Sequence, residues 1–115
     1  MSDNRREQFI KRLSSVGMGT RESVHVLLGS IVYDVREQVV RKQFKDDEMD
    51  AVVAFHDQAE ALWRDTLSTD PPLDIEQMVA RLTKLRDVCT GPLGQYHAKL
   101  ERGVRSAEEF RREHP

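Results

Sequence analysis

The chain has few cysteine, glycine, proline and aromatic residues, and it has no long apolar run. Its 115 residues include one cysteine, six glycines and four prolines, and aromatic residues make up 6%. A single cysteine excludes an intramolecular disulfide, so an apolar core must hold the fold together. No apolar run reaches the roughly 18 residues that span a bilayer, and the first residues are charged, unlike those of a signal peptide. We therefore expect a cytoplasmic protein without a membrane segment.

Charge is abundant but almost balanced, with 33% charged residues and a net charge of −2. This balance argues against a protein that binds nucleic acid over its whole surface. The acids are unevenly distributed, because residues 45–74 carry nine acidic and two basic residues. This acidic middle could attract a basic partner, but a solvated acidic helix face is the simpler interpretation.

Basic side chains gather near both ends of the chain and could form one face if the fold brings the ends together. Few aromatic residues lie among them, so stacking on single-stranded nucleic acid is not indicated. A nucleic-acid accessory protein is therefore an alternative that we favour less than a protein-binding one. The basic residues concerned are Arg5, Arg6, Lys11, Arg12, Lys99, Arg102, Arg105, Arg111 and Arg112.

Short breaks divide the chain into helical segments rather than separate domains. Between the breaks, apolar residues recur three and four positions apart, which is the spacing of one helix face. Such short connections favour antiparallel neighbouring helices. The breaks fall at 17–19, 45–47, 68–72 and 91–94. We predict helices over about 4–16, 21–44, 47–67, 75–90 and 94–104, with a further turn or two from Ser106.

Residues at the predicted helix ends have side chains that such positions favour. Thr20 can cap the second helix, and Asp46 or Asp47 can cap the third. Asp74 begins the fourth helix with a glutamine three residues later, which is the spacing of a capping box. Gly91, followed by a proline, should end that helix.

Together these segments predict an all-α fold, namely a single domain over 1–115. We expect a bundle of four main helices plus a short C-terminal helix, with the helix over 21–44 at its centre. The ends, about 1–3 and 112–115, should be frayed. The expected core consists of Phe9, Leu13, Val24, Leu28, Ile31, Val35, Val52, Ala59, Trp63, Met78, Leu82 and Leu85.

One segment, 24–36, fits either a helix or a hairpin. Its β-branched residues on either side of Gly29 and Ser30 resemble two strands joined by a two-residue turn. However, the helical spacing of its apolar residues continues to Val39, beyond the end of such a hairpin. The hairpin would also lack a third strand to support it. We therefore favour the helix.

The second predicted helix has two apolar faces, whereas an ordinary surface helix has one. At about 100° per residue, a broad arc from Val24 to Val39 forms one face. A second stripe lies on roughly the opposite side and consists of Val26, Tyr33, Val40 and Phe44. Either neighbouring helices cover this stripe, or it meets another chain, with Tyr33 and Phe44 as aromatic anchors. In the second case it is a partner interface, which could be that of a homodimer.

His56 and Glu60 are the best candidates for chemistry. They lie one turn apart on the apolar side of the third predicted helix, where a carboxylate can orient an imidazole as a base or metal ligand. A half-buried histidine satisfied by its helix neighbour explains the pair more simply. A carboxylate-bridged di-iron bundle would need a second Glu-x-x-His motif, which the sequence lacks. We therefore predict no metal and no cofactor, and keep a bundle enzyme or metal site at this pair as an alternative.

A short motif is similar to that of histidine phosphotransfer domains, which are helical bundles of about this length: His25-Val26-Leu27-Leu28-Gly29-Ser30. In that family the histidine carries the phosphoryl group, a lysine three residues later helps to neutralise it, and the glycine leaves room for the response regulator. Here Gly29 and Ser30 match, but Leu28 stands in place of the lysine. The resemblance implies phosphotransfer at His25 as a further alternative.

No catalytic constellation is present in the sequence, which has no Gly-rich phosphate loop and no nucleophile elbow. Cys89 lies on an apolar face near a helix C-terminus, which indicates a core residue rather than a nucleophile. Trp63 also fits the core. We therefore expect a small non-enzymatic interaction module, such as an adaptor, inhibitor or regulator. It would bind a protein partner or a second copy of itself through the second stripe.

Overall fold

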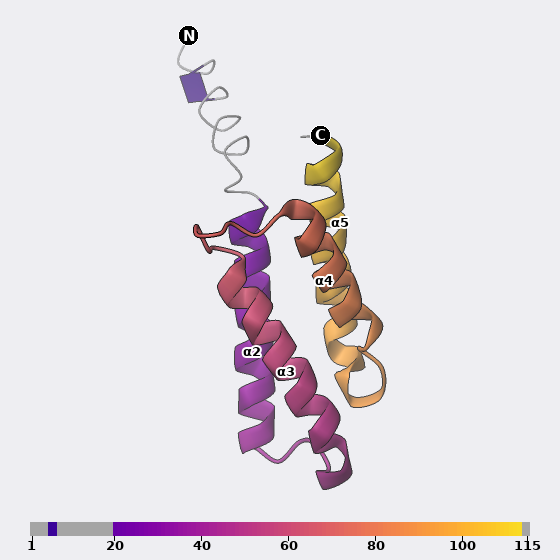
Figure 1. Cartoon of the computed structure of the whole chain (residues 1–115). Helices are drawn as coiled ribbons and strands as arrows, with labels where there is room; N and C mark the ends of the chain where they lie inside the picture. The colour runs from indigo at the N-terminus through magenta and orange to yellow at the C-terminus, as the bar shows by residue number, and fades with distance from the viewer. Residues whose placement is uncertain (1–4, 7–19, 114–115) are drawn as a thin grey trace.

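The computed structural model describes residues 5–6 and 20–113, and this part of the chain forms an all-α bundle (Figure 1). Its only β pairing, within the described residues, is an isolated bridge between Thr69 and Pro72. The predicted fold class is therefore confirmed. The four main helices are α2 (Arg21–Val40), α3 (Met49–Asp65), α4 (Ile75–Asp87) and α5 (His97–Glu113), and the two 3₁₀ helices are η1 (Asp46–Glu48) and η2 (Gly91–Tyr96).

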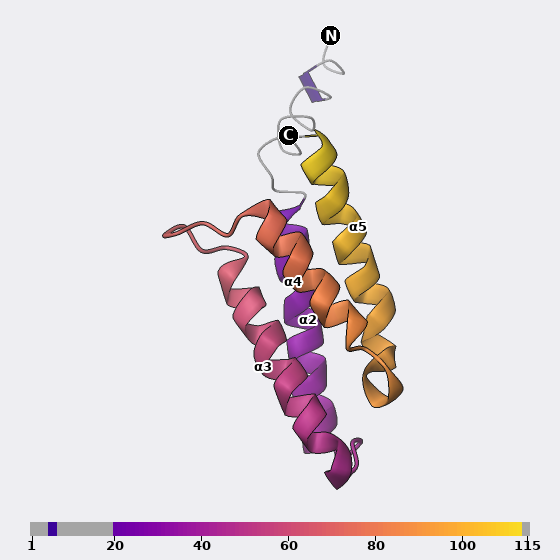
Figure 2. The ribbon, with the colours of Figure 1, turned by 45° about the vertical axis from the view of Figure 1, so that its right-hand side comes forward.

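The helices form two antiparallel hairpins that pack side by side. Figures 1 and 2 show α2 beside α3 and α4 beside α5, with the connection after α3 leading from one hairpin to the other. The hairpins meet through α3 against α4 and through α2 against α5. Helix α2 therefore packs on two neighbours and does not lie at the centre of the bundle as predicted. None of the described helices carries an apolar stretch long enough to cross a bilayer.

The apolar core lies between the two hairpins and takes side chains from all four helices. Every predicted core residue within the described part of the chain is buried, except Trp63, which is partly buried against the core. Phe9 and Leu13 lie outside the described residues. The sequence did not single out the contribution of η2 and α5 to this core, which consists of Leu93, Tyr96, Leu100, Val104 and Ala107.

Helix α2 covers the segment 24–36, so the helical interpretation was right and the hairpin is excluded. It ends at Val40 rather than at residue 44. Lys42 adopts a positive φ of 58° and donates its N–H to the Val39 carbonyl, while Gln43 donates to the Gln38 carbonyl. These two bonds close a Schellman motif, in which lysine occupies the position that glycine usually takes.

The ends of the other helices differ from the prediction in three places. Asp74 caps α4 by accepting the N–H of Glu76 at 2.8 Å, as expected. That helix, however, ends at Asp87, and Gly91, with a φ of 56°, begins η2 instead of ending α4. Neither Asp46 nor Asp47 caps α3, because both lie inside η1, at whose start the Glu48 carboxylate accepts the N–H of Lys45 at 2.7 Å.

The C-terminal helix is a full member of the bundle, not a short addition. Helix α5 runs without a break through Ser106, where we predicted a new start. Gly103, Val104 and Ala107 are all buried on either side of that residue, so packing keeps the helix continuous. The residues 112–113, predicted to be frayed, form its last turn. The predicted helix over 4–16 lies outside the described residues apart from 5–6.

A small polar network joins α2 to η2 at the boundary of the two hairpins. The Asp34 carboxylate accepts hydrogen bonds from the Tyr96 hydroxyl and from the Gln38 amide, each at 2.7 Å. Gln38 also exchanges hydrogen bonds with Gln95 at 2.8 and 3.1 Å. Burial and the bond to Asp34 raise the pKa of Tyr96 above its ordinary value. The tyrosine ring stacks on Phe55 at 5.7 Å, so the network is anchored in the core.

Candidate interaction surface

The second apolar stripe of α2 is exposed along most of its length. Val26, Tyr33 and Val40 are 69%, 60% and 80% exposed. Phe44, the fourth predicted member, is 8% exposed and belongs to the core, because the chain turns back after the Schellman motif. We name Val26, Tyr33 and Val40 the α2 stripe. None of the helices over residues 20–113 covers it, so within this part of the chain α2 is not buried on both sides.

The central residue of the α2 stripe is held by its neighbours. The Tyr33 ring meets the indole of Trp63 edge-on at 5.8 Å, and the Arg36 guanidinium lies 5.6 Å from the tyrosine ring. The indole itself lies on Gly29, where an added Cβ would be only 2.9 Å from its Nε1 atom. Glycine is therefore needed here for close approach. Tyr33 is exposed yet supported, which suits an anchor that loses little side-chain entropy on binding.

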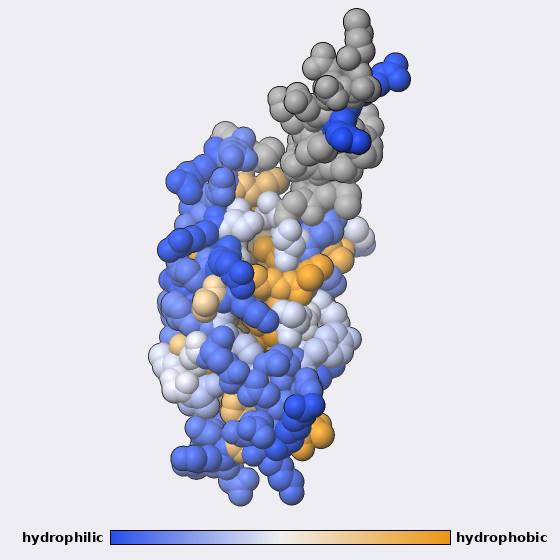
Figure 3. Space-filling model, turned by 180° about the vertical axis from the view of Figure 1, so that it is seen from behind, coloured by the Kyte–Doolittle hydropathy of each residue, from blue (hydrophilic) through white to orange (hydrophobic). Residues whose placement is uncertain are grey.

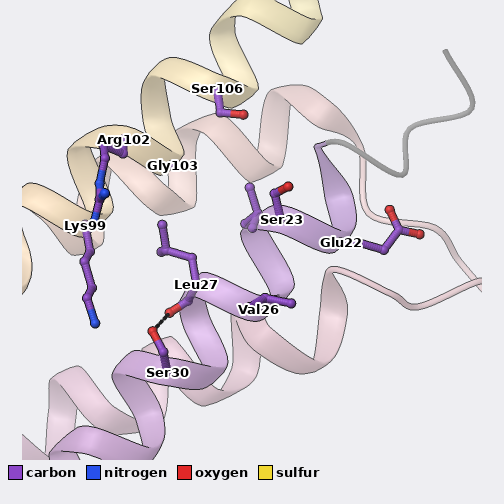
Figure 4. A pocket seen from close by; sticks show the side chains of 10 residues that line it. Glu22, Ser23, Val26, Leu27, Ser30, Lys99, Arg102, Gly103 and Ser106 are labelled. Atoms are coloured by element: carbon purple, nitrogen blue, oxygen red, sulfur yellow. Dashed lines mark hydrogen bonds between the residues drawn. The ribbon is translucent and has the colours of Figure 1, made fainter. Parts of the chain in front are cut away.

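A groove of about 550 Å³ lies between α2 and α5, beside the α2 stripe. Figure 3 shows it from behind as an apolar hollow between hydrophilic borders, and Figure 4 shows its side chains. We name it the α2/α5 groove. It is lined from α2 by Glu22, Ser23, Val24, Val26, Leu27 and Ser30, and from α5 by Lys99, Arg102, Gly103 and Ser106.

A smaller and almost wholly apolar hollow of about 300 Å³ lies on the other side of the stripe, between α2 and α3. Val40 borders it from α2 and Val53, which is 49% exposed, borders it from α3. Its floor includes Val39, Met49 and Val52. The exposed apolar face of α2 is thus widened on both sides. The α2/α5 groove lies beside the N-terminal half of the helix, and the hollow toward α3 lies beside its C-terminal half.

His56 and Glu60 both bind an arginine of the neighbouring helix, and neither nitrogen of the His56 ring bonds Glu60. The Arg36 guanidinium donates one hydrogen bond to Nε2 of His56 at 3.0 Å and another to the Glu60 carboxylate. Because His56 Nε2 accepts, its Nδ1–H donates to Asp57 at 3.0 Å. Glu60 also meets Arg64 at 3.4 Å. The pair therefore ties α3 to α2 with both imidazole nitrogens engaged.

This arrangement leaves little room for the chemistry that we considered for the pair. A general base needs a free lone pair facing a substrate, whereas His56 already accepts from Arg36. Across the described residues, no three side chains of His, Cys, Asp or Glu gather closely enough to hold a metal ion. The sequence offered no signal for Arg36, because its role depends on how the two helices lie against each other.

His25 does not have the surroundings that its motif implies. Its Nδ1–H donates to the Trp63 carbonyl and the Thr66 hydroxyl, both at 2.9 Å, and its ring stacks on the indole at 5.4 Å. Gly29, which leaves room for the response regulator in histidine phosphotransfer domains, is covered here by Trp63 of the same chain. The resemblance therefore lacks both its lysine and its open glycine face.

Cys89 is buried, as predicted, and is 4% exposed. Its thiol donates to the Leu85 carbonyl at 3.2 Å. Burial raises the pKa of the thiol to about 11, so the nucleophilic thiolate is scarce near neutral pH. Both observations fit a small core residue.

The basic residues near the C-terminus are only partly available. Arg105 and Arg86 both bind Glu101, and Arg111 binds Glu76 at 3.0 Å. Arg86 and Arg105 hold the pKa of Glu101 below its ordinary value. In the part of the chain that the structure describes, Lys99 and Arg102 form no ion pair, and both border the α2/α5 groove. Arg5 and Arg6 are exposed, whereas Lys11 and Arg12 lie outside the described residues.

The chain matches no protein-family model, no curated protein and no solved structure. Its function must therefore be argued from its own surfaces. On the described residues, exposed apolar groups gather along the α2 stripe, in the α2/α5 groove and in the hollow between α2 and α3.

Proposed function

We propose that the protein is a small non-enzymatic interaction module, a regulator or adaptor, that pairs with a second copy of itself through the α2 stripe. The exposure of Val26, Tyr33 and Val40 carries this proposal. Three large apolar side chains in line on one helix are a costly surface to leave in water. The α2 stripe also has an aromatic residue at its centre, as interfaces favour.

The spacing of the α2 stripe favours a second copy over an unrelated partner. Its residues are seven positions apart, or about 10 Å along the helix, with Tyr33 in the middle. An antiparallel copy related by a two-fold axis through Tyr33 would set the two tyrosines against each other. The same axis would pair Val26 with Val40 of the second copy, so the stripe is complementary to itself.

The size of the contact sets the expected affinity. Helix α2 has 20 residues and is therefore about 30 Å long. A single pair of helices of this length buries less area than a permanent dimer requires. We therefore expect reversible association, suited to a regulator. The composition, with one free cysteine, supports action in the cytoplasm.

The test is the solution mass, measured by size-exclusion chromatography with light scattering over a series of concentrations. The wild type should approach the mass of a dimer as concentration rises. Tyr33→Glu should remain a monomer with an unchanged circular dichroism spectrum, because the side chain is exposed. Val88→Glu is the matched control: Val88 is 45% exposed at the end of α4, away from the stripe. A wild type that stays monomeric throughout would overturn the proposal.

A further inference from the structure

The α2/α5 groove combines an apolar floor with an unneutralised basic border. From these two features we propose that it is a docking site for an amphipathic helix of a partner protein, one that carries carboxylates beside its apolar face. The occupant differs in chemistry from the second copy proposed for the α2 stripe. The two surfaces also rest on different residues, apart from Val26, which lies on the ridge between them.

The floor of the groove is formed where α2 and α5 come close. Leu27 points from α2 toward α5 in Figure 4, and its Cδ2 atom would lie 3.8 Å from a Cβ added at Gly103. Leu27 is only partly buried and forms the accessible floor, whereas Val24 beside it is 1% exposed and adds almost no surface. The Ser30 hydroxyl donates to the Leu27 carbonyl at 2.7 Å, so its polar group is turned back onto its own helix. The floor therefore offers apolar surface to a ligand.

The border on the α5 side carries positive charge that the described part of the chain does not neutralise. Lys99 and Arg102 form no ion pair there, whereas the next arginine along α5, Arg105, binds Glu101 at 3.1 Å. In Figure 4, Lys99 extends along the groove toward Ser30. Glu22 also lines the groove, but it lies at the opposite end and its carboxylate points away from these cations in the same view.

The dimensions and the charge together define the occupant. The groove follows α2 from Glu22 to Ser30, which is about 12 Å or roughly two helical turns. Two turns present apolar side chains three and four positions apart to such a floor. Carboxylates on the flank facing α5 would then meet Lys99 and Arg102. The chain's own residues 7–19 carry Lys11 and Arg12 against one acid, so their charge does not match this border.

The probe is a fluorescein-labelled helical peptide of about 15 residues, with leucines three and four apart on one face and glutamates beside them. A second peptide has lysines in place of the glutamates. Binding to the full chain is measured by fluorescence anisotropy at low and high salt. We expect the acidic peptide to bind at least about tenfold more tightly than the basic one, and less tightly as salt rises.

Variants separate this site from the α2 stripe. The double variant Lys99→Glu/Arg102→Glu should weaken the acidic peptide by about tenfold or more, while Lys84→Glu, a reversal of another exposed lysine outside the groove, should not. Tyr33→Glu should leave peptide binding intact even if it abolishes self-association. Groove binding would be refuted by equal affinity for both peptides, by no binding at low salt, or by indifference to the double reversal. Binding of the acidic peptide can also be followed by NMR. Amide chemical-shift changes confined to Tyr33 and Val40 would refute binding in the groove.

Discussion

Replacing Gly29 by alanine should destabilise the protein, whereas the same replacement at Gly103 should stabilise it. Both glycines lie inside helices, where alanine is favoured over glycine by about 1 kcal/mol. The two substitutions therefore share one favourable contribution and differ only in what the new methyl group meets. Their comparison isolates the close approach of Trp63 to α2.

The distances give the size of the difference. At Gly29 the methyl carbon would lie 2.9 Å from Nε1 and 3.4 Å from Cε2 of Trp63, so the rigid indole must move. Forcing extra volume into a packed site costs about 1–3 kcal/mol, more than the helix gain on average. At Gly103 the nearest atom is Cδ2 of Leu82 at 3.6 Å, an ordinary contact. We expect the alanine variant at Gly29 to be about 1–3 kcal/mol less stable than the one at Gly103.

The assay is urea unfolding followed by far-ultraviolet circular dichroism and by fluorescence. Trp63 is the only tryptophan, so its emission reports on the indole directly. In Gly29→Ala the emission of the native state should change, because the ring leaves its stack on His25. The reasoning would be refuted if Gly29→Ala were as stable as Gly103→Ala and its emission matched that of the wild type.

Three further predictions concern polar groups. The pKa of Cys89, raised by burial from 9.0 to about 11, keeps the thiol protonated in the folded state while the unfolded chain ionises. The free energy of unfolding should thus fall between pH 9 and 11, by at most about 1.4 kcal/mol per pH unit. In urea unfolding, Cys89→Ala should lack this part of the fall with pH. If the free energies of wild type and variant ran parallel over this pH range, the prediction would be contradicted. Tyr96→Phe removes the hydrogen bond to Asp34 and should cost about 1 kcal/mol in the same assay, so equal stability would count against that bond. His56→Ala should cost less than about 1 kcal/mol, since Arg36 keeps its carboxylate partner; metal retained by the wild type and lost in this variant would instead favour the metal-site alternative.

Helical periodicity was a sufficient guide to the elements and to most of the core. The apolar arc of α2 continues past the turn that a hairpin would need, and the structure confirms the helix. Asp74 was recognisable as a cap because its side chain acts on its own helix, within two residues. The two predictions that α2 is a helix and that Asp74 caps α4, which depend on residues of one helix only, were therefore confirmed.

Predictions failed where contacts between distant residues decide the structure. Phe44 continues the spacing of the α2 stripe, but a Schellman motif at Lys42, without a glycine to signal it, turns the side chain into the core. Ser106 has the signature of a helix start, yet the burial of Ala107 keeps α5 continuous. The partners of Arg36 follow from the packing of α2 on α3, which no local pattern encodes.

The network around Asp34 has a consequence for how the two hairpins find their alignment. Aliphatic side chains are nearly interchangeable, so a core made of them tolerates several settings in which one hairpin slides or rotates against the other. Hydrogen bonds are directional and are satisfied in one setting only. The hydrogen bonds among four residues thus fix the position of one hairpin against the other: Asp34, Gln38, Gln95 and Tyr96. Their contribution is to make one packed arrangement unique, more than to make it strong.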